Sequence, residues 1–304
     1  MRSPLVVIVG ETASGKSALA LELARRFDGE LICADSWTVY KEFNVGTAKP
    51  TKAEQAEIRH HLLDIADPAR GFSAVEFQRL AKQAIKDIVS RGKLPIMVGG
   101  TGLYIDSVLY DYQFLPAPDP AERERLNQLS LDELVRLTEE RALSTDGIDM
   151  RNKRRVIRLL ENDGIRPDKG TLRLDTLIMG IATDREHLRQ RITQRVDAML
   201  AAGLEQEVKK LAQRYGWQVE PMKGIGYREW RAYVEPEDTA AGYDGQSLEQ
   251  TRQRIISATM QLAKRQRTWF KPLDETNYQG RIHWLSQTDA LAQAVAYTTT
   301  FTRK

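Results

Sequence analysis

An α/β fold, with a parallel sheet wrapped by helices, is the fold class that this sequence predicts. Three short apolar runs carry the prediction and read as buried strands: Leu5–Val9, Glu30–Ala34 and Leu94–Val98. Helical patterns over Ala18–Arg26 and Ser73–Arg91 lie between them, and the second starts with a serine three residues before a glutamate, which is a capping box. Strands that alternate with helices in this way favour a parallel sheet.

The alternation is interrupted once, which predicts an inserted domain. Three closely spaced prolines begin the interruption: Pro116, Pro118 and Pro120. From Ala121 to Asn162 the chain is charged and helical in pattern, and it has no strand signal. We therefore expect a core made of residues 1–115 and 170–304, with an all-helical insertion over residues 116–169.

Further elements are expected on either side of this insertion. His61–Ile65 is a candidate third strand, and Asp175–Ile181 returns to strand character after the insertion. Asp184 is placed to cap an amphipathic helix that ends near Leu200, and a second long helix is expected over Ser247–Phe270. The polar stretch Glu235–Gln246 is predicted to be a surface loop.

The most specific motif follows the first strand. It fits the phosphate-loop pattern GxxxxGK[ST] and consists of Gly10, Glu11, Thr12, Ala13, Ser14, Gly15, Lys16 and Ser17. Backbone N–H groups and the dipole of the following helix attract an anion there, and Lys16 adds a full positive charge. The Ser17 hydroxyl can join the shell of a Mg²⁺ ion. The sequence therefore predicts a P-loop NTPase-like core that binds a di- or triphosphate.

Two further polar residues directly follow predicted strands. Asp35 ends the second strand, and Thr101 lies in the Gly99–Gly102 turn after the fourth. Because ligands of such sheets bind at the carboxyl ends of the strands, both residues should converge with the phosphate loop. Asp35 has three possible roles, as a magnesium ligand, a general base or a turn-forming residue. Thr101 could contact a ligand, or the turn could serve only to start a helix.

Composition restricts the class of protein. The chain has 304 residues, 41% hydrophobic and 29% charged, with a net charge of +3. Overall charge therefore gives no argument for a nucleic-acid partner, and only local clusters can. A single cysteine, Cys33, excludes an internal disulfide framework and a thiolate zinc site. The N-terminal apolar run has only five residues, and no run is long enough to span a membrane, so a cytoplasmic protein is expected.

Basic residues cluster in two places. The first cluster, in the insertion, comprises Arg151, Lys153, Arg154, Arg155 and Arg158, and helical spacing would put its four arginines on one face. It is either a solvated helix face or a phosphate-binding surface. The second cluster comprises Lys264, Arg265, Arg267 and Lys271, interleaved with Trp269 and Phe270. Those two aromatic residues could stack on bases or anchor the core. His60 and His61 are interpreted as structural.

Several motifs together resemble the tRNA dimethylallyltransferases, in their bacterial form without a zinc finger. In chain order they are Thr12–Ser17, Asp35-Ser36 with Tyr40, Gly46–Pro50, Gly99–Tyr104, Arg154–Arg158, Gln190–Arg195, Gly226–Arg228, and Leu262–Gln266 with Trp269. The resemblance extends from about Leu5 to Leu285. It implies transfer of a dimethylallyl group from dimethylallyl diphosphate to the adenosine beside the tRNA anticodon, by a monomer that uses Mg²⁺.

The resemblance also implies roles for individual residues. The phosphate loop would hold the donor diphosphate, with Mg²⁺ near Ser17, and Arg195 would hold the diphosphate from the opposite wall. Asp35 would accept a proton or hydrogen bond from the adenine amine, and Thr101 would contact the same region. The tRNA-binding residues would be Asp35, Ser36, Trp37, Thr38, Thr101, Arg123, Arg154, Arg155, Val156, Ile157 and Arg158.

Two residues depart from the family pattern, and two other functions compete. The family usually has proline where this chain has Glu11, and a carboxylate beside a diphosphate is unfavourable unless its side chain points away. Trp37 could stack on a base or fill a hydrophobic gap. The alternatives are an adenylate isopentenyltransferase, for which a basic helical insertion would be superfluous, and a P-loop kinase, for which no lid motif is evident.

Overall fold

The computed structural model describes residues 4–235, 246–270 and 277–303. The chain forms two compact units. The first comprises residues 1–108 and 172–304, and the second comprises residues 109–171. The predicted insertion, residues 116–169, falls inside the second unit. The predicted loop Glu235–Gln246 lies almost entirely outside the described residues, as does Lys271 of the second basic cluster.

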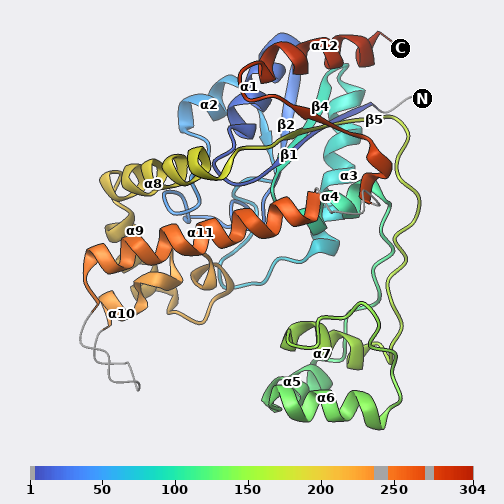
Figure 1. Cartoon of the computed structure of the whole chain (residues 1–304), viewed down its shortest axis with the longest axis vertical. Coiled ribbons are helices and arrows are strands. Elements are labelled where there is room, and N and C mark those ends of the chain that lie inside the picture. The colour runs from blue at the N-terminus through green and yellow to red at the C-terminus, as the bar shows by residue number, and fades with distance from the viewer. Residues whose placement is uncertain (1–3, 236–245, 271–276, 304) are drawn as a thin grey trace. The chain divides into compact units, whose positions relative to one another are not determined.

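The first unit is built on a six-stranded parallel sheet (Figure 1). Its strands are β1 (Leu5–Gly10), β2 (Gly29–Ala34), β3 (His60–His61), β4 (Leu94–Gly99), β5 (Thr176–Ile181) and β6 (Ile282–Leu285), in the order β3-β2-β4-β1-β5-β6. Its helices include α1 (Lys16–Arg26), α2 (Lys52–Glu57), α3 (Ala74–Ser90), α4 (Gly102–Leu109), α8 (Arg185–Ala201), α9 (Leu204–Tyr215), α10 (Arg231–Val234), α11 (Leu248–Phe270) and α12 (Ala290–Thr302). The predicted α/β class with a parallel sheet is confirmed.

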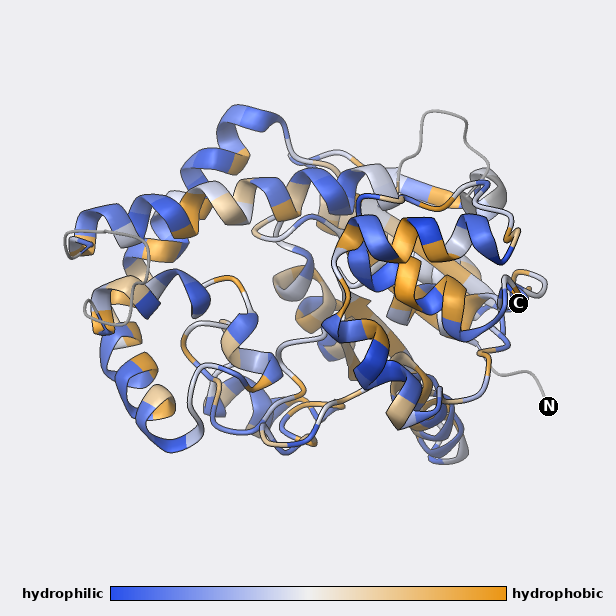
Figure 2. Ribbon diagram, turned by 90° about the horizontal axis from the view of Figure 1, so that it is seen from below, coloured by the Kyte–Doolittle hydropathy of each residue, from blue (hydrophilic) through white to orange (hydrophobic). Residues whose placement is uncertain are grey.

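The central strands are apolar throughout because helices cover both faces of the sheet. Val6 and Ile8 of β1 share one buried cluster with residues of α1 and with Ala294 of α12. Val7 and Val9, which point to the other face, are also fully buried. Along the helices, hydrophilic and hydrophobic residues alternate in bands (Figure 2), as expected where one side packs and the other is exposed.

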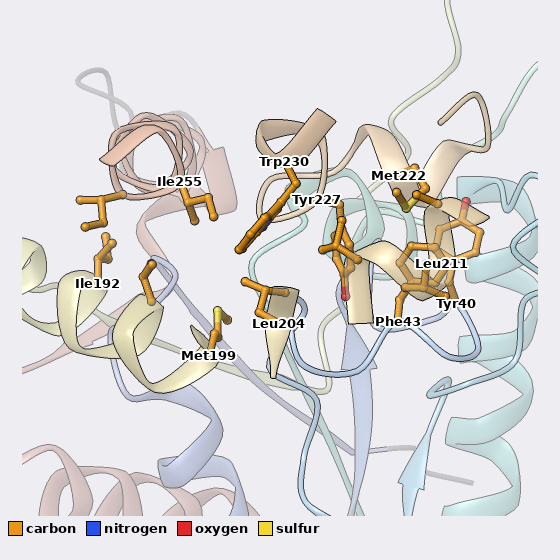
Figure 3. Packing of buried hydrophobic residues seen from close by; sticks show 14 of the residues in the cluster. Tyr40, Phe43, Ile192, Met199, Leu204, Leu211, Met222, Tyr227, Trp230 and Ile255 are labelled. Carbon is orange, nitrogen blue, oxygen red and sulfur yellow. The ribbon is translucent and has the colours of Figure 1, made fainter. Parts of the chain in front are cut away.

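A second hydrophobic cluster joins α8, α9 and α11 to the segment between β2 and α2. The ring of Trp230 lies between Leu204 and the helix that carries Ile255 (Figure 3). Tyr227 packs edge-on against Phe43, with ring centroids 4.9 Å apart. Through this cluster α8 and α11 are held side by side next to the sheet.

Predicted helix starts agree with the observed caps. Ser73 and Glu76 form the capping box of α3, and Asp184 accepts hydrogen bonds from the first N–H groups of α8. The predicted strand His61–Ile65 is wrong beyond His61. Leu62 and Asp64 adopt left-handed φ values of 62° and 55°, which end the extended chain.

The second unit contains three helices: α5 (Pro120–Gln128), α6 (Leu131–Glu140) and α7 (Lys153–Glu161). Leu126, Leu134, Val156, Ile157 and Leu160 form its core, so this short segment has a hydrophobic centre of its own. Arg151 precedes the cap residue Asn152 and is not part of α7. The predicted single face of four arginines is therefore wrong for Arg151. In the described part of the chain, no helix is both long and apolar enough to cross a membrane.

Candidate functional site

The phosphate loop follows β1 and leads into α1, as the motif predicts. Gly15 has φ of 96°, a left-handed conformation that glycine adopts without strain. The ammonium of Lys16 folds back and donates a hydrogen bond to the carbonyl of Glu11 at 3.0 Å. From α8, the guanidinium of Arg191 donates to the carbonyl of Ser14 at 3.2 Å. Loop amides, a helix N-terminus and two cations thus gather at one point, as an anion site requires.

Asp35 and Thr101 converge as predicted, because β2, β4 and β1 are adjacent parallel strands. The backbone N–H of Ser36 donates to Thr101 Oγ1 at 3.1 Å. One carboxylate oxygen of Asp35 accepts the N–H of Trp37 at 2.8 Å and that of Thr38 at 3.3 Å. Asp35 therefore does shape a turn. Its second oxygen accepts no hydrogen bond from the described residues, and it remains available to a ligand.

The phosphate loop and Asp35 line one cavity of about 200 Å³. Polar and charged groups at its wall are Thr12, Lys16, Ser17, Asp35, Thr38, Thr47, Lys49, Glu54, His60, Arg195 and Gln266. Apolar side chains form another part of the wall: Leu21, Leu31, Val98 and Leu262. The buried thiol of Cys33 also lines it, and burial raises its pKa to about 12, which keeps it protonated at neutral pH. A ligand with both an anionic and a hydrocarbon part suits this lining.

Two cations of this cavity, Lys16 and Arg195, have no carboxylate within salt-bridge distance among the described residues, whereas the third, Lys49, is paired with Asp64. Burial, and secondarily the charge of Arg195, lowers the pKa of Lys16 to about 8. Burial also lowers the pKa of Arg195, while Asp35 acts in the opposite direction. Arg195 donates one long hydrogen bond, 3.4 Å, to the carbonyl of Thr47. Half-buried positive charges without a carboxylate partner are unfavourable alone, so the cavity is suited to an anion.

Glu11 does not face this cavity. Its side chain is buried and forms a two-pronged ion pair with the guanidinium of Arg267, which also donates to the carbonyl of Thr183. The carboxylate is thereby neutralised beside the loop, which removes the electrostatic objection to its presence. Arg267 belongs to the predicted second basic cluster, and this contact gives it an internal role. Phe270 is buried, so it anchors the core.

A loop between β2 and α2 closes another side of the cavity, and sequence reasoning missed what holds it. The Glu207 carboxylate accepts hydrogen bonds from the N–H groups of Asn44, Val45 and Gly46 at 2.9–3.1 Å, and from the Tyr227 hydroxyl at 2.7 Å. Glu207 comes from α9, more than 160 residues away along the chain. The chain has no local pattern that could have revealed this clamp.

Trp37 and Thr38 lie beside Asp35. Trp37 is half-buried, packs against the cluster of Figure 3 and lines a second, smaller cavity that Asp35 and Arg195 share. It therefore packs, as one of its two predicted roles required, and it also faces the site. Thr38 is buried and lines the larger cavity, where its hydroxyl has no hydrogen-bond partner among the described groups.

In the second unit the predicted tRNA-binding residues separate into three groups. Arg123 forms a two-pronged pair with the buried carboxylate of Glu161, and Arg158 approaches the same carboxylate at 3.5 Å. Val156 and Ile157 are buried in the core of the unit, so any part they play in tRNA binding is limited to positioning α7. Arg154 and Arg155 are exposed.

Comparison with known proteins shows the family of the chain. The family model described as IPP transferase matches residues 38–272, which is most of the chain. The chain belongs to the IPP transferase family. A tRNA dimethylallyltransferase of Anoxybacillus flavithermus is 41% identical to this family member over 95% of the chain and 92% of the relative. A tRNA dimethylallyltransferase of an Exiguobacterium species is 44% identical over 89% of the chain and 88% of the relative.

Solved structures of similar IPP transferases cover nearly the whole chain. The tRNA isopentenylpyrophosphate transferase of Bacillus halodurans aligns with a TM-score of 0.72 at 31% identity, over 99% of this chain and 98% of that one. A eukaryotic dimethylallyltransferase acting on tRNA aligns with a TM-score of 0.77 at 28% identity, over 96% of this chain and 77% of that one. The similarity to these structures therefore extends over nearly the whole chain.

Proposed function

We propose that the protein transfers a dimethylallyl group from dimethylallyl diphosphate to the exocyclic amine of the adenosine 3′-adjacent to the anticodon of tRNA. The observation that carries the proposal is the single cavity in which Lys16 and Arg195 lie with Asp35 and an apolar wall. The cations suit a diphosphate, the apolar wall suits the hydrocarbon chain, and the carboxylate suits the amine. The proposal agrees with the name tRNA dimethylallyltransferase of a relative and with a similar solved structure described as acting on tRNA.

The reaction follows from these groups. The adenine amine is a weak nucleophile because its lone pair is conjugated with the ring, so departure of the leaving group must drive the step. The amine nitrogen forms a bond to C1 of the allyl group while the C1–O bond breaks, and both electrons leave with diphosphate. Loop amides, Lys16 and Arg195 stabilise the growing negative charge. The proton of the amine passes to Asp35, which also orients the adenine.

Magnesium is part of the proposal. The Ser17 hydroxyl lines the cavity beside Lys16, and a hydroxyl oxygen next to substrate phosphates is the kind of ligand set that Mg²⁺ takes in phosphate loops. When bound, the ion would supply additional positive charge to the departing diphosphate. None of the steps assigned to Lys16, Arg195 and Asp35 depends on the ion's position.

The partner, oligomeric state and location are inferred from the same site. A tRNA anticodon arm is the proposed acceptor, and the exposed Arg154 and Arg155 would contact its phosphates. We propose a monomer, since the groups of the donor cavity all come from one chain. A cytoplasmic location is proposed because unmodified tRNA is the substrate.

One experiment tests the function. The protein is incubated with radiolabelled dimethylallyl diphosphate, Mg²⁺ and either unmodified tRNA or AMP, and the label is followed. We expect transfer to tRNA and none to AMP. Transfer to AMP alone would instead support the adenylate isopentenyltransferase. Turnover of ATP without transfer to either acceptor would support the kinase.

A further inference from the structure

Gln266, near the end of α11, is buried and makes two hydrogen bonds in opposite directions. Its carbonyl oxygen accepts the backbone N–H of Thr12 in the phosphate loop at 2.7 Å. Its amide nitrogen donates to the carbonyl of Gly100 at 3.1 Å. Thr12 and Gly100 lie after different strands, β1 and β4, and Gln266 is far from both along the chain. One side-chain amide thus joins two loops of the site.

The contact is close on both sides. A Cβ added at Gly100 would lie 2.2 Å from Nε2 of Gln266, so position 100 has no room for a side chain as long as the amide is there. Gln266 is 9% exposed, which means that neither bond is exchanged readily with water. The side-chain amide has a fixed size, and it is hydrogen-bonded to a backbone group of each loop. Its two hydrogen bonds therefore set the distance between the two loops.

The bridge continues to the carboxylate. Gly100 is followed by Thr101, whose hydroxyl accepts the N–H of Ser36, the neighbour of Asp35. A chain of short contacts therefore runs from the phosphate loop through Gln266 and Thr101 to the segment that carries Asp35. In the proposed function the leaving diphosphate lies at one end of this chain and the attacking amine at the other.

We propose that Gln266 is a positioning residue that fixes the distance between the diphosphate site and the Asp35 site, and so governs turnover more than donor affinity. The proposal rests on the proposed function. Lys16, Arg195 and the loop amides would still bind the diphosphate without Gln266. Transfer requires the allyl carbon and the amine to be aligned, and a displacement of about 1 Å can cost about 100-fold in rate.

Two substitutions separate the bonds. Gln266→Met keeps the length of the side chain and removes both bonds. Gln266→Glu keeps the acceptor for Thr12, but when ionised it places a carboxylate against the Gly100 carbonyl. Once protonated, the introduced carboxyl can donate to Gly100 and accept from Thr12, so it restores the bridge. Burial favours the protonated form, which brings its titration toward neutral pH.

The measurements are kcat and KM for tRNA and donor, the equilibrium affinity for dimethylallyl diphosphate, and Tm. For Gln266→Met we expect kcat to fall by about 100-fold, with the donor dissociation constant changed by no more than about threefold. For Gln266→Glu we expect the kcat ratio to wild type to rise as pH is lowered from 8 to 6, while the Gln266→Met ratio stays flat. Gln261→Met is the matched control, since Gln261 lies exposed on the same helix.

Other titrating groups face Gln266 from both sides, which is why ratios to wild type are used. Charged groups of the two cavities that it lines are Glu11, Lys16, Asp35, Lys49, Glu54, His60, Asp184, Arg195 and Arg267. They are the same in each variant. A Gln266→Met protein with wild-type kcat, or a loss confined to donor affinity, would overturn the proposal. The proposal would also be overturned if the kcat ratio of Gln266→Glu to wild type equalled that of Gln266→Met at every pH. Failure of the wild-type protein to transfer the label would instead refute the proposed function on which it rests.

Discussion

Two cations of the sheet-end cavity and two of the helical unit differ in whether a carboxylate is paired with them. Lys16 and Arg195 are half-buried, and among the described residues neither has a carboxylate within salt-bridge distance, whereas Lys49 of the same cavity is paired with Asp64. In the second unit, Arg123 and Arg158 both meet the buried carboxylate of Glu161. A cation that already has an internal partner contributes to folding, whereas a buried cation without one is available to a ligand. The number of arginines is therefore a poorer guide to binding than their pairing.

The largest expected effect concerns Asp35. Asp35→Asn keeps an oxygen for the N–H groups of Trp37 and Thr38, so the turn survives, but the amide cannot accept a proton. We expect transfer to fall by about 100-fold to 10,000-fold, with donor affinity nearly unchanged. Labelled transfer and equilibrium donor binding measure the two quantities.

Asp67→Asn is the control for this variant, because Asp67 also shapes an exposed turn through its carboxylate, outside the cavity. If Asp35→Asn retained turnover close to that of the wild type, Asp35 would be a turn residue only. The free carboxylate oxygen would then have no catalytic meaning.

The next effect is a pH dependence of donor binding that comes from Lys16. Since the pKa of Lys16 is lowered to about 8 in the free protein, the ammonium is mostly charged at pH 7 and mostly neutral at pH 9. Diphosphate binds the charged form, so donor affinity is expected to fall as pH rises through 8, by up to about tenfold per pH unit. Above pH 7 the donor's own charge is essentially constant, because its last pKa is about 6.

Lys16→Arg provides the comparison, because its guanidinium stays charged over this range. Its affinity is expected to be lower at pH 7 and nearly constant up to pH 9. Donor binding measured at intervals between pH 7 and 10 distinguishes the two proteins. An identical pH profile for both would mean that Lys16 is not the titrating group.

Sequence alone predicted the parts of the site that depend on neighbouring residues. The phosphate loop, the capping box of Ser73 and Glu76, and the strands that lead to Asp35 and Gly99 are local patterns, and the parallel sheet then places Thr101 beside Ser36. Contacts between distant segments were not predictable. Thr12 and Gln266 are 254 residues apart, and Glu11 and Arg267 are 256 apart. The sequence around each of these residues contains no pattern from which its partner could be predicted.

The Glu11–Arg267 pair gives a smaller, structural effect. Arg267→Met leaves the Glu11 carboxylate buried without its partner, which we expect to lower the free energy of unfolding by about 1–3 kcal/mol. The partly exposed guanidinium puts the effect toward the lower end. Glu11→Gln in the same protein removes the unpaired charge and should recover part of the loss. Denaturant unfolding of the single and double variants measures this coupling.

Arg265→Met is the control on the same helix, because Arg265 is exposed and forms no ion pair within the part of the chain that the structure describes. Additive effects in the double variant would contradict the pairing. In that case the presence of a carboxylate at position 11 of the phosphate loop would be unexplained.

The smallest expected effect tests the other side of the comparison, the exposed arginines of the helical unit. Arg154→Ala with Arg155→Ala should weaken tRNA binding by about tenfold and reduce the slope of log affinity against log salt by about 0.7–0.9 for each phosphate that is no longer neutralised. Arg123→Met should instead lower stability and leave the salt slope unchanged, because Arg123 is bound to Glu161. Lys86→Ala, exposed on α3, controls for net charge. Equal salt slopes for the wild type and the double variant would make Arg154 and Arg155 a solvated face. A reduced slope for Arg123→Met would show that the pair with Glu161 does not keep Arg123 from contacting tRNA.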